Sequence, residues 1–273
     1  MKKLKTYKPT DTFFPVKEME AVKLNWDYVD KTGKNDLSNT GYKCIVRADT
    51  NEGLRCMTND YKLGENKEIF NIASPIVKEK GGLLTEVKNF GNGARTKYKF
   101  TFPDIKVKIT KEDVLHPHID MWNSYDGTHQ VNLLSGCFRL ICSNGLVIGH
   151  MISNYNFRHL IGNDNLTPEN FAQAVQKSID KTIEIFDKDF PKLIETNAKS
   201  SDKAKFIKML PEYVSDDVVA KLLSGQKMNT YWDLINVATY LATHIMNRNW
   251  ESTHKWETKV YPTVKSWALK AQS

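Results

Sequence analysis

Three residues that could ligate a metal ion or move protons occupy alternate positions in the stretch HPHID: His116, His118 and Asp120. On a β-strand, residues two apart share a face, so the two imidazoles and the carboxylate could hold one divalent cation. A metal-dependent hydrolase is therefore one hypothesis for this chain. Against it, we find no second matching cluster of ligands, and Pro117 favours a loop or a sheet edge over a rigid ligand strand. We predict no metal, no cofactor and no enzymatic activity.

The four cysteines offer little chemistry. Cys137 and Cys142 would lie on opposite faces of a strand, where they cannot share a metal ion, and free cysteine is usually a core residue. Together with Cys44 and Cys56 they do not resemble a disulfide framework, which predicts a reduced, cytoplasmic protein. The sequence also lacks the glycine-rich phosphate-binding loops and the G-x-S-x-G and C-x-x-C motifs.

A run of alternating cations is the most informative pattern. In GARTKYKFTFPDIKVKI, Arg95, Lys97 and Lys99 share one face of a strand, and Lys106 and Lys108 share a face beyond the Pro103-Asp104 turn. Burial of the aromatic face should turn all five cations outward together on a hairpin. Phosphate is the natural anion to sit among them. A plain solvated sheet face explains the pattern equally well, because lysine protects exposed strands.

Further residues could support nucleic-acid binding. Arg47 and Arg139 are secondary candidates for phosphate contacts, although either could be a structural ion-pair partner. Tyr42, Tyr61 and Tyr125 are candidates for base stacking, and each could equally belong to the core. The formal net charge of +7 favours a polyanionic partner only weakly. No apolar run is long enough for a transmembrane helix, and the basic N-terminus is not followed by the apolar core of a secretory signal.

These residues must be positioned by two kinds of segment. Residues 41 to 149 read as short strands with turns at 49–53, 91–93, 126–127 and 143–145, and with one helix at 66–82 that Pro75 could break or bend. From Asn165 onward the pattern is helical: Thr167 and Thr230 are N-caps, and Pro191 and Pro262 should end, kink or interrupt their helices. We predict an α+β fold with an antiparallel sheet, comprising a β-rich core over residues 1–163 and a helical region over 164–273, which could form one continuous unit.

Three blocks of the chain carry a family resemblance: GYKCIVRADTNEGL, NSYDGTHQVNLLSGCFRLICSNGL and NTYWDLINVATYLATH. In order and spacing they resemble the phage- and plasmid-borne family called domain of unknown function 932. Tyr125 stands where the family pattern leads us to expect a histidine, which argues against a metal or acid–base role there. The resemblance implies a mobile-element protein in the host cytoplasm and brings no catalytic residues with it. A distant likeness to phage single-strand annealing proteins is an analogy without a matching motif.

The first hypothesis is a nucleic-acid-binding protein of a phage or mobile element that anneals single strands during recombination. Such a protein would form a homo-oligomer and need no membrane. The alternative is a non-enzymatic interaction protein that blocks or regulates a host factor, with no salt-dependent binding to DNA.

Overall fold

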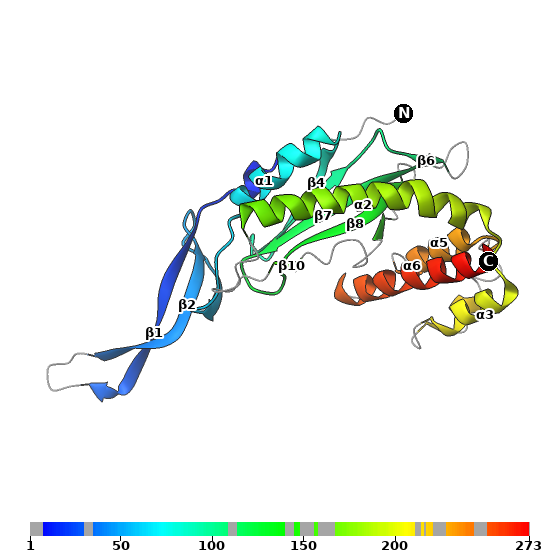
Figure 1. Ribbon diagram of the computed structural model, residues 1–273. Helices are drawn as coiled ribbons and strands as arrows, with labels where there is room; N and C mark the ends of the chain where they lie inside the picture. The colour runs from blue at the N-terminus through cyan, green and yellow to red at the C-terminus, as the bar shows by residue number, and fades with distance from the viewer. Residues whose placement is uncertain are drawn as a thin grey trace.

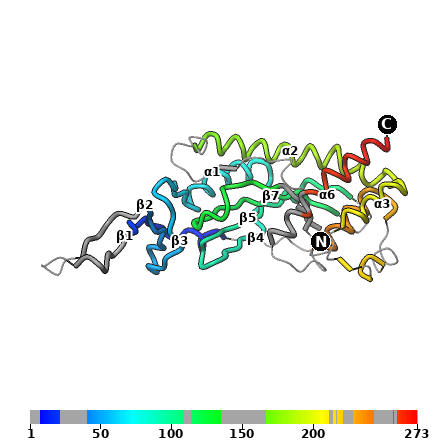
Figure 2. The backbone as a smooth tube through the Cα atoms, turned by 90° about the horizontal axis from the view of Figure 1, so that it is seen from below, coloured from blue at the N-terminus to red at the C-terminus, as the bar shows by residue number. Residues whose placement is uncertain are grey.

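The structure is a computed structural model that describes the backbone of residues 8–29, 35–108, 114–139, 145–147, 156–157, 167–210, 214–215, 217–220, 228–242 and 250–272. It describes their side chains except at 22–40, 135–147, 156–157, 250–255 and 257–258. The molecule is elongated, with a long hairpin at one end and the C-terminal helices at the other (Figure 1). Figure 2 shows the same arrangement from below.

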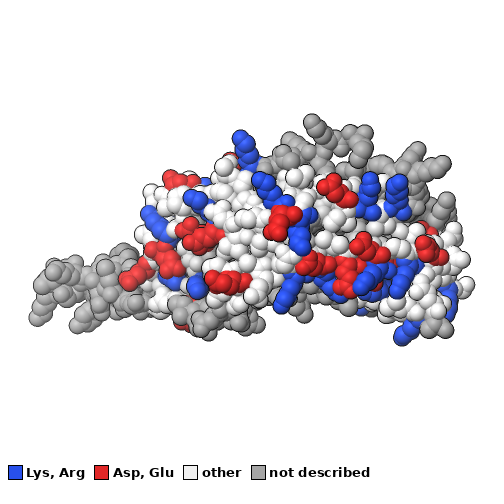
Figure 3. Space-filling view, turned by 45° about the horizontal axis from the view of Figure 1, so that its top comes forward, with Lys and Arg blue, Asp and Glu red and all other residues white. Residues whose placement is uncertain are grey.

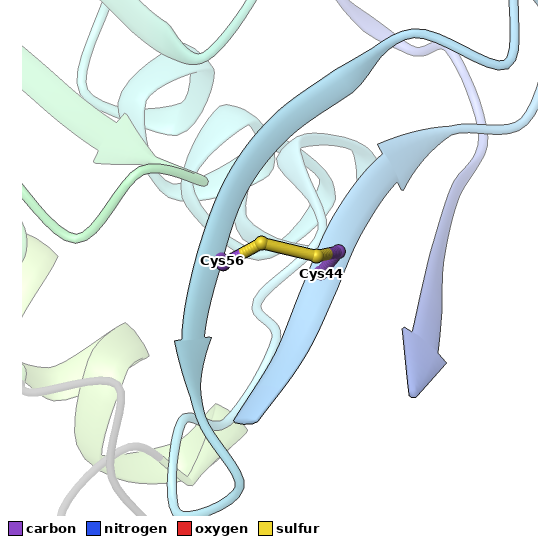
Figure 4. Close-up of a disulfide and its surroundings, with 2 residues drawn as sticks. All are labelled: Cys44 and Cys56. Carbon is purple, nitrogen blue, oxygen red and sulfur yellow. A yellow bond between two sulfur atoms is a disulfide. The ribbon is translucent and has the colours of Figure 1, made fainter. Parts of the chain in front are cut away.

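A small antiparallel sheet forms the hairpin end. Its strands are β1 (Val16–Val29), β2 (Asn35–Arg47) and β3 (Gly53–Thr58), in the order β1-β2-β3. The expected turn at residues 49–53 connects β2 to β3, but strand β1 was not anticipated from the sequence. Cys44 lies directly opposite Cys56, and the two form a disulfide (Figure 4). The expectation of unpaired cysteines is therefore wrong for this pair, because the register of two neighbouring strands brings together residues that are far apart in the chain.

The main antiparallel sheet holds seven strands in the order β10-β8-β7-β5-β4, with β6 beside β7 and β9 beside β8. The strand bounds are β4 (Leu83–Phe90), β5 (Arg95–Thr101), β6 (Val107–Lys108), β7 (Val114–Ser124), β8 (Val131–Arg139), β9 (Gly145–Val147) and β10 (Asn156–Phe157). The predicted turns at 91–93 and 126–127 join β4 to β5 and β7 to β8. Strands β8 and β9 run antiparallel, and the predicted turn at 143–145 lies outside the described residues except for Gly145, which begins β9.

Helices α1 (Asn66–Glu79) and α2 (Pro168–Glu195) cover one face of the main sheet (Figure 1). Apolar residues spaced three or four apart give each helix one apolar stripe. The stripe of α1 packs against Tyr98 and Phe100 of β5, and the stripe of α2 joins the same core over β7 and β8. The first half of α2 belongs to this core through residues such as Phe171 and Ile179. Its second half, around Phe186 and Phe190, belongs to a second core that includes the C-terminal helices. One long helix therefore links both cores.

The remaining helices with described bounds are α3 (Ser200–Lys208), α5 (Tyr231–Tyr240) and α6 (Trp250–Gln272). Thr230 and Asp233 form a capping box at the start of α5, as their spacing predicts. The expected breaks at Pro75, Pro191 and Pro262 are wrong, because α1, α2 and α6 run through them. Each proline has a buried residue one or two positions before it: Ala73, Phe190 and Tyr261. The packing of these residues into a core offsets the hydrogen bond that the proline removes from its helix. The α+β class is confirmed.

Gly93 occupies a tight turn between β4 and β5. Its φ of +93° is left-handed, and an added Cβ would lie 2.5 Å from the ring of Phe14. We expect Gly93→Ala to lower the free energy of unfolding by about 2 kcal/mol, because strain and overlap add together. Urea denaturation followed by circular dichroism measures this. Gly53→Ala is the control, since no atom lies within 4 Å of its added Cβ, and it should change stability by less than about 0.5 kcal/mol. Equal effects of the two substitutions would contradict the prediction.

Candidate nucleic-acid interface

Four of the five predicted cations lie on one face of the main sheet, opposite the face that α1 and α2 cover, and the fifth, Lys106, directly precedes β6. We call all five the cationic row: Arg95, Lys97, Lys99, Lys106 and Lys108. The register places Arg95 opposite Ser124 of β7, Lys99 opposite Asp120, and Lys108 opposite Val114. Because opposite residues of paired strands share a face, the cations of β5 and β6 follow the length of β7, over about 34 Å at the rise of an extended strand. The prediction that they share a face is confirmed for Arg95, Lys97, Lys99 and Lys108 and stays a prediction for Lys106.

The cations do not lie on a hairpin. Strands β5 and β6 both pair with β7, one after the other, instead of pairing with each other across Pro103-Asp104. Pro117, in turn, is not in a loop or at an edge but within β7, between β5 and β8. Its carbonyl oxygen accepts from the backbone N–H of Phe102, just past the end of β5. The missing N–H of Pro117 is on this same side, just past the end of β5, so the pair makes one hydrogen bond instead of two.

Lys97 lies at the centre of a buried ionic cluster. Its Nζ is 2.5 Å from Oε1 of Glu86 on β4 and 3.7 Å from Oδ2 of Asp120 on β7. Lys97 is 9% exposed and Asp120 is 6% exposed, and the ammonium group also lies 5.8 Å from the centre of the Trp122 ring. A buried cation between two carboxylates holds three strands together. Lys97 is therefore not a surface contact for phosphate, which corrects its assignment as one.

The protonation states support this cluster. Burial alone would raise the pKa of the Glu86 carboxyl, but the hydrogen bond from Lys97 and the charges of Lys97 and Lys99 lower it to about 2. Burial would also lower the pKa of the Lys97 ammonium, yet the charge of Asp120 and the hydrogen bond to Glu86 raise it above its ordinary value. Both groups are therefore ionised at neutral pH.

The two histidines beside the cluster do not form a metal centre with Asp120. Nε2 of His118 lies 3.7 Å from Oδ1 of Asp120, and Nδ1 of His116 lies 3.1 Å from the carbonyl oxygen of Ile105. Burial lowers the pKa of His118 to about 3, so its imidazole is neutral. Within the described ranges, no three His, Cys, Asp or Glu side chains come together in a way that could hold a metal ion.

The other members of the row differ in exposure. Arg95 is half-buried, and its Nε lies 3.3 Å from Oδ2 of Asp126. Lys99 is half-buried, and its charge helps to lower the pKa of Glu86. Lys106 and Lys108 are exposed, and neither makes an ion pair with a carboxylate in the part of the chain that the structure describes. The solvent-facing charge of the row therefore concentrates at its β6 end.

Arg47 has a structural role at the joint between the two sheets. It makes two hydrogen bonds to the carboxylate of Asp49, of 2.6 and 3.0 Å, and donates one of 2.9 Å to the carbonyl oxygen of Asn92. Its guanidinium group lies 3.9 Å from the centre of the Phe14 ring. The bonds to Asp49 raise the pKa of Arg47. These contacts support the alternative given above, that Arg47 is a structural ion-pair partner. The backbone of Arg139 ends β8, and its side chain lies outside the described residues.

Two of the three candidate tyrosines are core residues. The hydroxyl of Tyr61 donates to the carbonyl oxygen of Ser124, and that of Tyr125 accepts from the backbone N–H of Asn66. Both are almost fully buried, whereas Tyr42 is 50% exposed on β2. Burial raises the pKa of both buried phenols. Only Tyr42 thus presents a ring to solvent.

Sequence reasoning missed Glu86, the closest partner of Lys97. Its signal was present: Glu86 and Lys88 alternate in LLTEVKNF, which places both on one face of a strand. The sequence does not show that this strand lies beside the strand of Lys97, with Glu86 and Lys97 on the same face of the sheet.

The fold and the site define an α+β protein whose antiparallel sheet carries helices on one face and a buried ionic cluster on the other. The family model described as "Domain of unknown function (DUF932)" matches residues 53–264, so the chain belongs to this family. The chain matches no curated protein and no solved structure. Within the described helices, none is long and apolar enough to cross a membrane.

Proposed function

We propose that this protein binds single-stranded nucleic acid and anneals it in recombination of a phage or mobile element in the host cytoplasm. The observation that carries the proposal is the exposed pair Lys106 and Lys108, which continues a row of cations along one strand. Phosphates are the polyanions that such a row would meet in the cell. Residues of the buried cluster do not contact the ligand in this proposal but hold β4, β5 and β7 in place.

The face that carries α1 and α2 is less suited to a polyanion. Lys80 pairs with Asp180 at 3.2 Å, and Lys181 and Lys188 both pair with Glu184. Figure 3, which brings the top of Figure 1 forward, shows Lys and Arg interspersed with Asp and Glu over the described atoms. Because these lysines are paired with nearby carboxylates, the helix-covered face has little net positive potential to attract a phosphate backbone.

Replacing Lys106 and Lys108 by serine is expected to weaken binding to a single-stranded oligonucleotide about 25-fold at 0.1 M salt. Two lost phosphate contacts should also flatten the log–log salt dependence by about 1.4 on single strands. Fluorescence anisotropy at several salt concentrations measures both quantities.

The control is Lys67→Ser/Lys78→Ser, which removes the same charge from exposed positions of α1 on the opposite face. It should leave binding and its salt dependence close to those of the wild type. If both double variants lost the same affinity, the effect would come from net charge and not from this surface. If the wild type showed no salt-dependent binding, the alternative of an interaction protein that acts on a host factor would be favoured.

A further inference from the structure

Among the strands that the structure describes, β1 and β3 end the small sheet and β4 and β10 end the path of the main sheet, so each has an unpaired side. Within the described residues, β4 pairs only with β5 and is the last strand of the main sheet, while β1 pairs only with β2 and is the last strand of the small sheet. A sheet edge presents a row of backbone N–H and C=O groups that another strand can pair with. Each edge is therefore a potential site of strand addition.

Exposed apolar side chains collect at two of these edges, β1 and β4. The structure describes five large hydrophobic residues as exposed, and three of them lie on these two edge strands: Met19 on β1 (49% exposed), and Leu83 and Phe90 on β4 (39% and 38%). A fourth, Tyr42 (50%), lies on β2 next to β1. The fifth, Leu269, lies on α6. Apolar groups concentrated at strand edges point to a protein partner.

The hairpin is fixed at its base and extends away from the body. Arg47 and a small core that includes Phe14, Ile45 and Tyr125 join the base to the main sheet. Strand β3 pairs with β2 only between Tyr42 and Val46, so among the described strands only β1 and β2 continue along the hairpin beyond Tyr42 (Figure 1). A two-stranded hairpin alone is marginally stable in water, and a further strand along its edge would stabilise it.

We infer that the β1 edge of one copy adds to the β4 edge of a second copy of this chain, in a head-to-tail contact. This arrangement brings the exposed residues of both edges into one interface, whereas a β1–β1 contact would leave Leu83 and Phe90 exposed. A head-to-tail contact repeats from copy to copy and produces a ring or a filament.

Photo-cross-linking tests the contact without any nucleic acid, so its outcome does not depend on the proposed function. A benzophenone side chain in place of Met19 is mixed with isotope-labelled wild-type protein, and the linked peptides are identified by mass spectrometry. We expect links to residues 83–90 of the labelled copy. Links to β1 of the other copy, links only within one chain, or a monomer by light scattering would overturn the inference.

A second variant separates the contact from misfolding. Met19, which is exposed on β1, is replaced by lysine, which removes the apolar side chain and would bury a charge in the contact. This variant should retain the circular dichroism of a folded protein and sediment as a monomer where the wild type sediments as an oligomer. A folded variant with an unchanged sedimentation coefficient would also overturn the inference.

Discussion

Lys97→Met is expected to lower the free energy of unfolding by about 3–5 kcal/mol, the cost of leaving a buried charge without its partner. The lysine lies 2.5 Å from Glu86 and 3.7 Å from Asp120, and Asp120 is buried. Methionine fills a similar volume but cannot neutralise two carboxylates. Urea denaturation at pH 7, followed by tryptophan fluorescence, measures the loss.

Two further variants determine whether charge is the cause. The triple variant Lys97→Met/Glu86→Gln/Asp120→Asn carries no charge at these positions and should recover most of the lost stability. Lys106→Met, at an exposed position of the same row, should stay within about 0.5 kcal/mol of the wild type. If Lys97→Met kept full stability and lost only affinity for nucleic acid, Lys97 would be a ligand contact instead of a structural residue.

Lys97 also shows which features of the site can be predicted from the sequence and which cannot. Strict alternation in RTKYKF was enough to place Tyr98 in the core and Arg95, Lys97 and Lys99 on the other face, because side chains of a strand alternate. Whether a cation is exposed depends on which strands lie beside it. Glu86 and Asp120 reach Lys97 from β4 and β7, and this neighbourhood is fixed by strand order and register, which the alternation does not encode.

Two other differences have physical causes of the same kind. Each proline in a helix costs a hydrogen bond locally, but packing of the neighbouring turns into a core outweighs a local preference. The N-terminal strand was missed although Val22, Leu24, Trp26 and Tyr28 are spaced two apart, the period of a strand. That spacing could have been used to predict β1. The sequence could not predict that the hairpin projects from the body, since this depends on where β3 ends.

Acidification from pH 7.5 to 4.5 is expected to destabilise the protein by about 2.5 kcal/mol through His118 alone. Burial lowers the pKa of this imidazole to about 3 in the folded state, against an ordinary value of 6.5. The unfolded chain therefore binds a proton below pH 6.5 that the folded chain does not, so stability falls as the pH falls from 6.5 towards 3. The groups that act on His118 are Asp120, Lys99, Lys97 and Glu86.

The interval between pH 6.5 and 4.5 isolates His118 from the carboxylates. The pKa of Glu86 moves from 4.5 to about 2 on folding, so its contribution is present above pH 4.5 and is lost only below it. His118→Gln should therefore flatten the dependence of the unfolding free energy on pH in that interval. His129→Gln, which removes a half-buried histidine beside Trp122 and leaves His118 in place, is the matched control for loss of an imidazole. A His118→Gln variant with the wild-type slope would show that this imidazole is protonated in the folded protein, and the neutral state assigned to it beside Asp120 would be wrong.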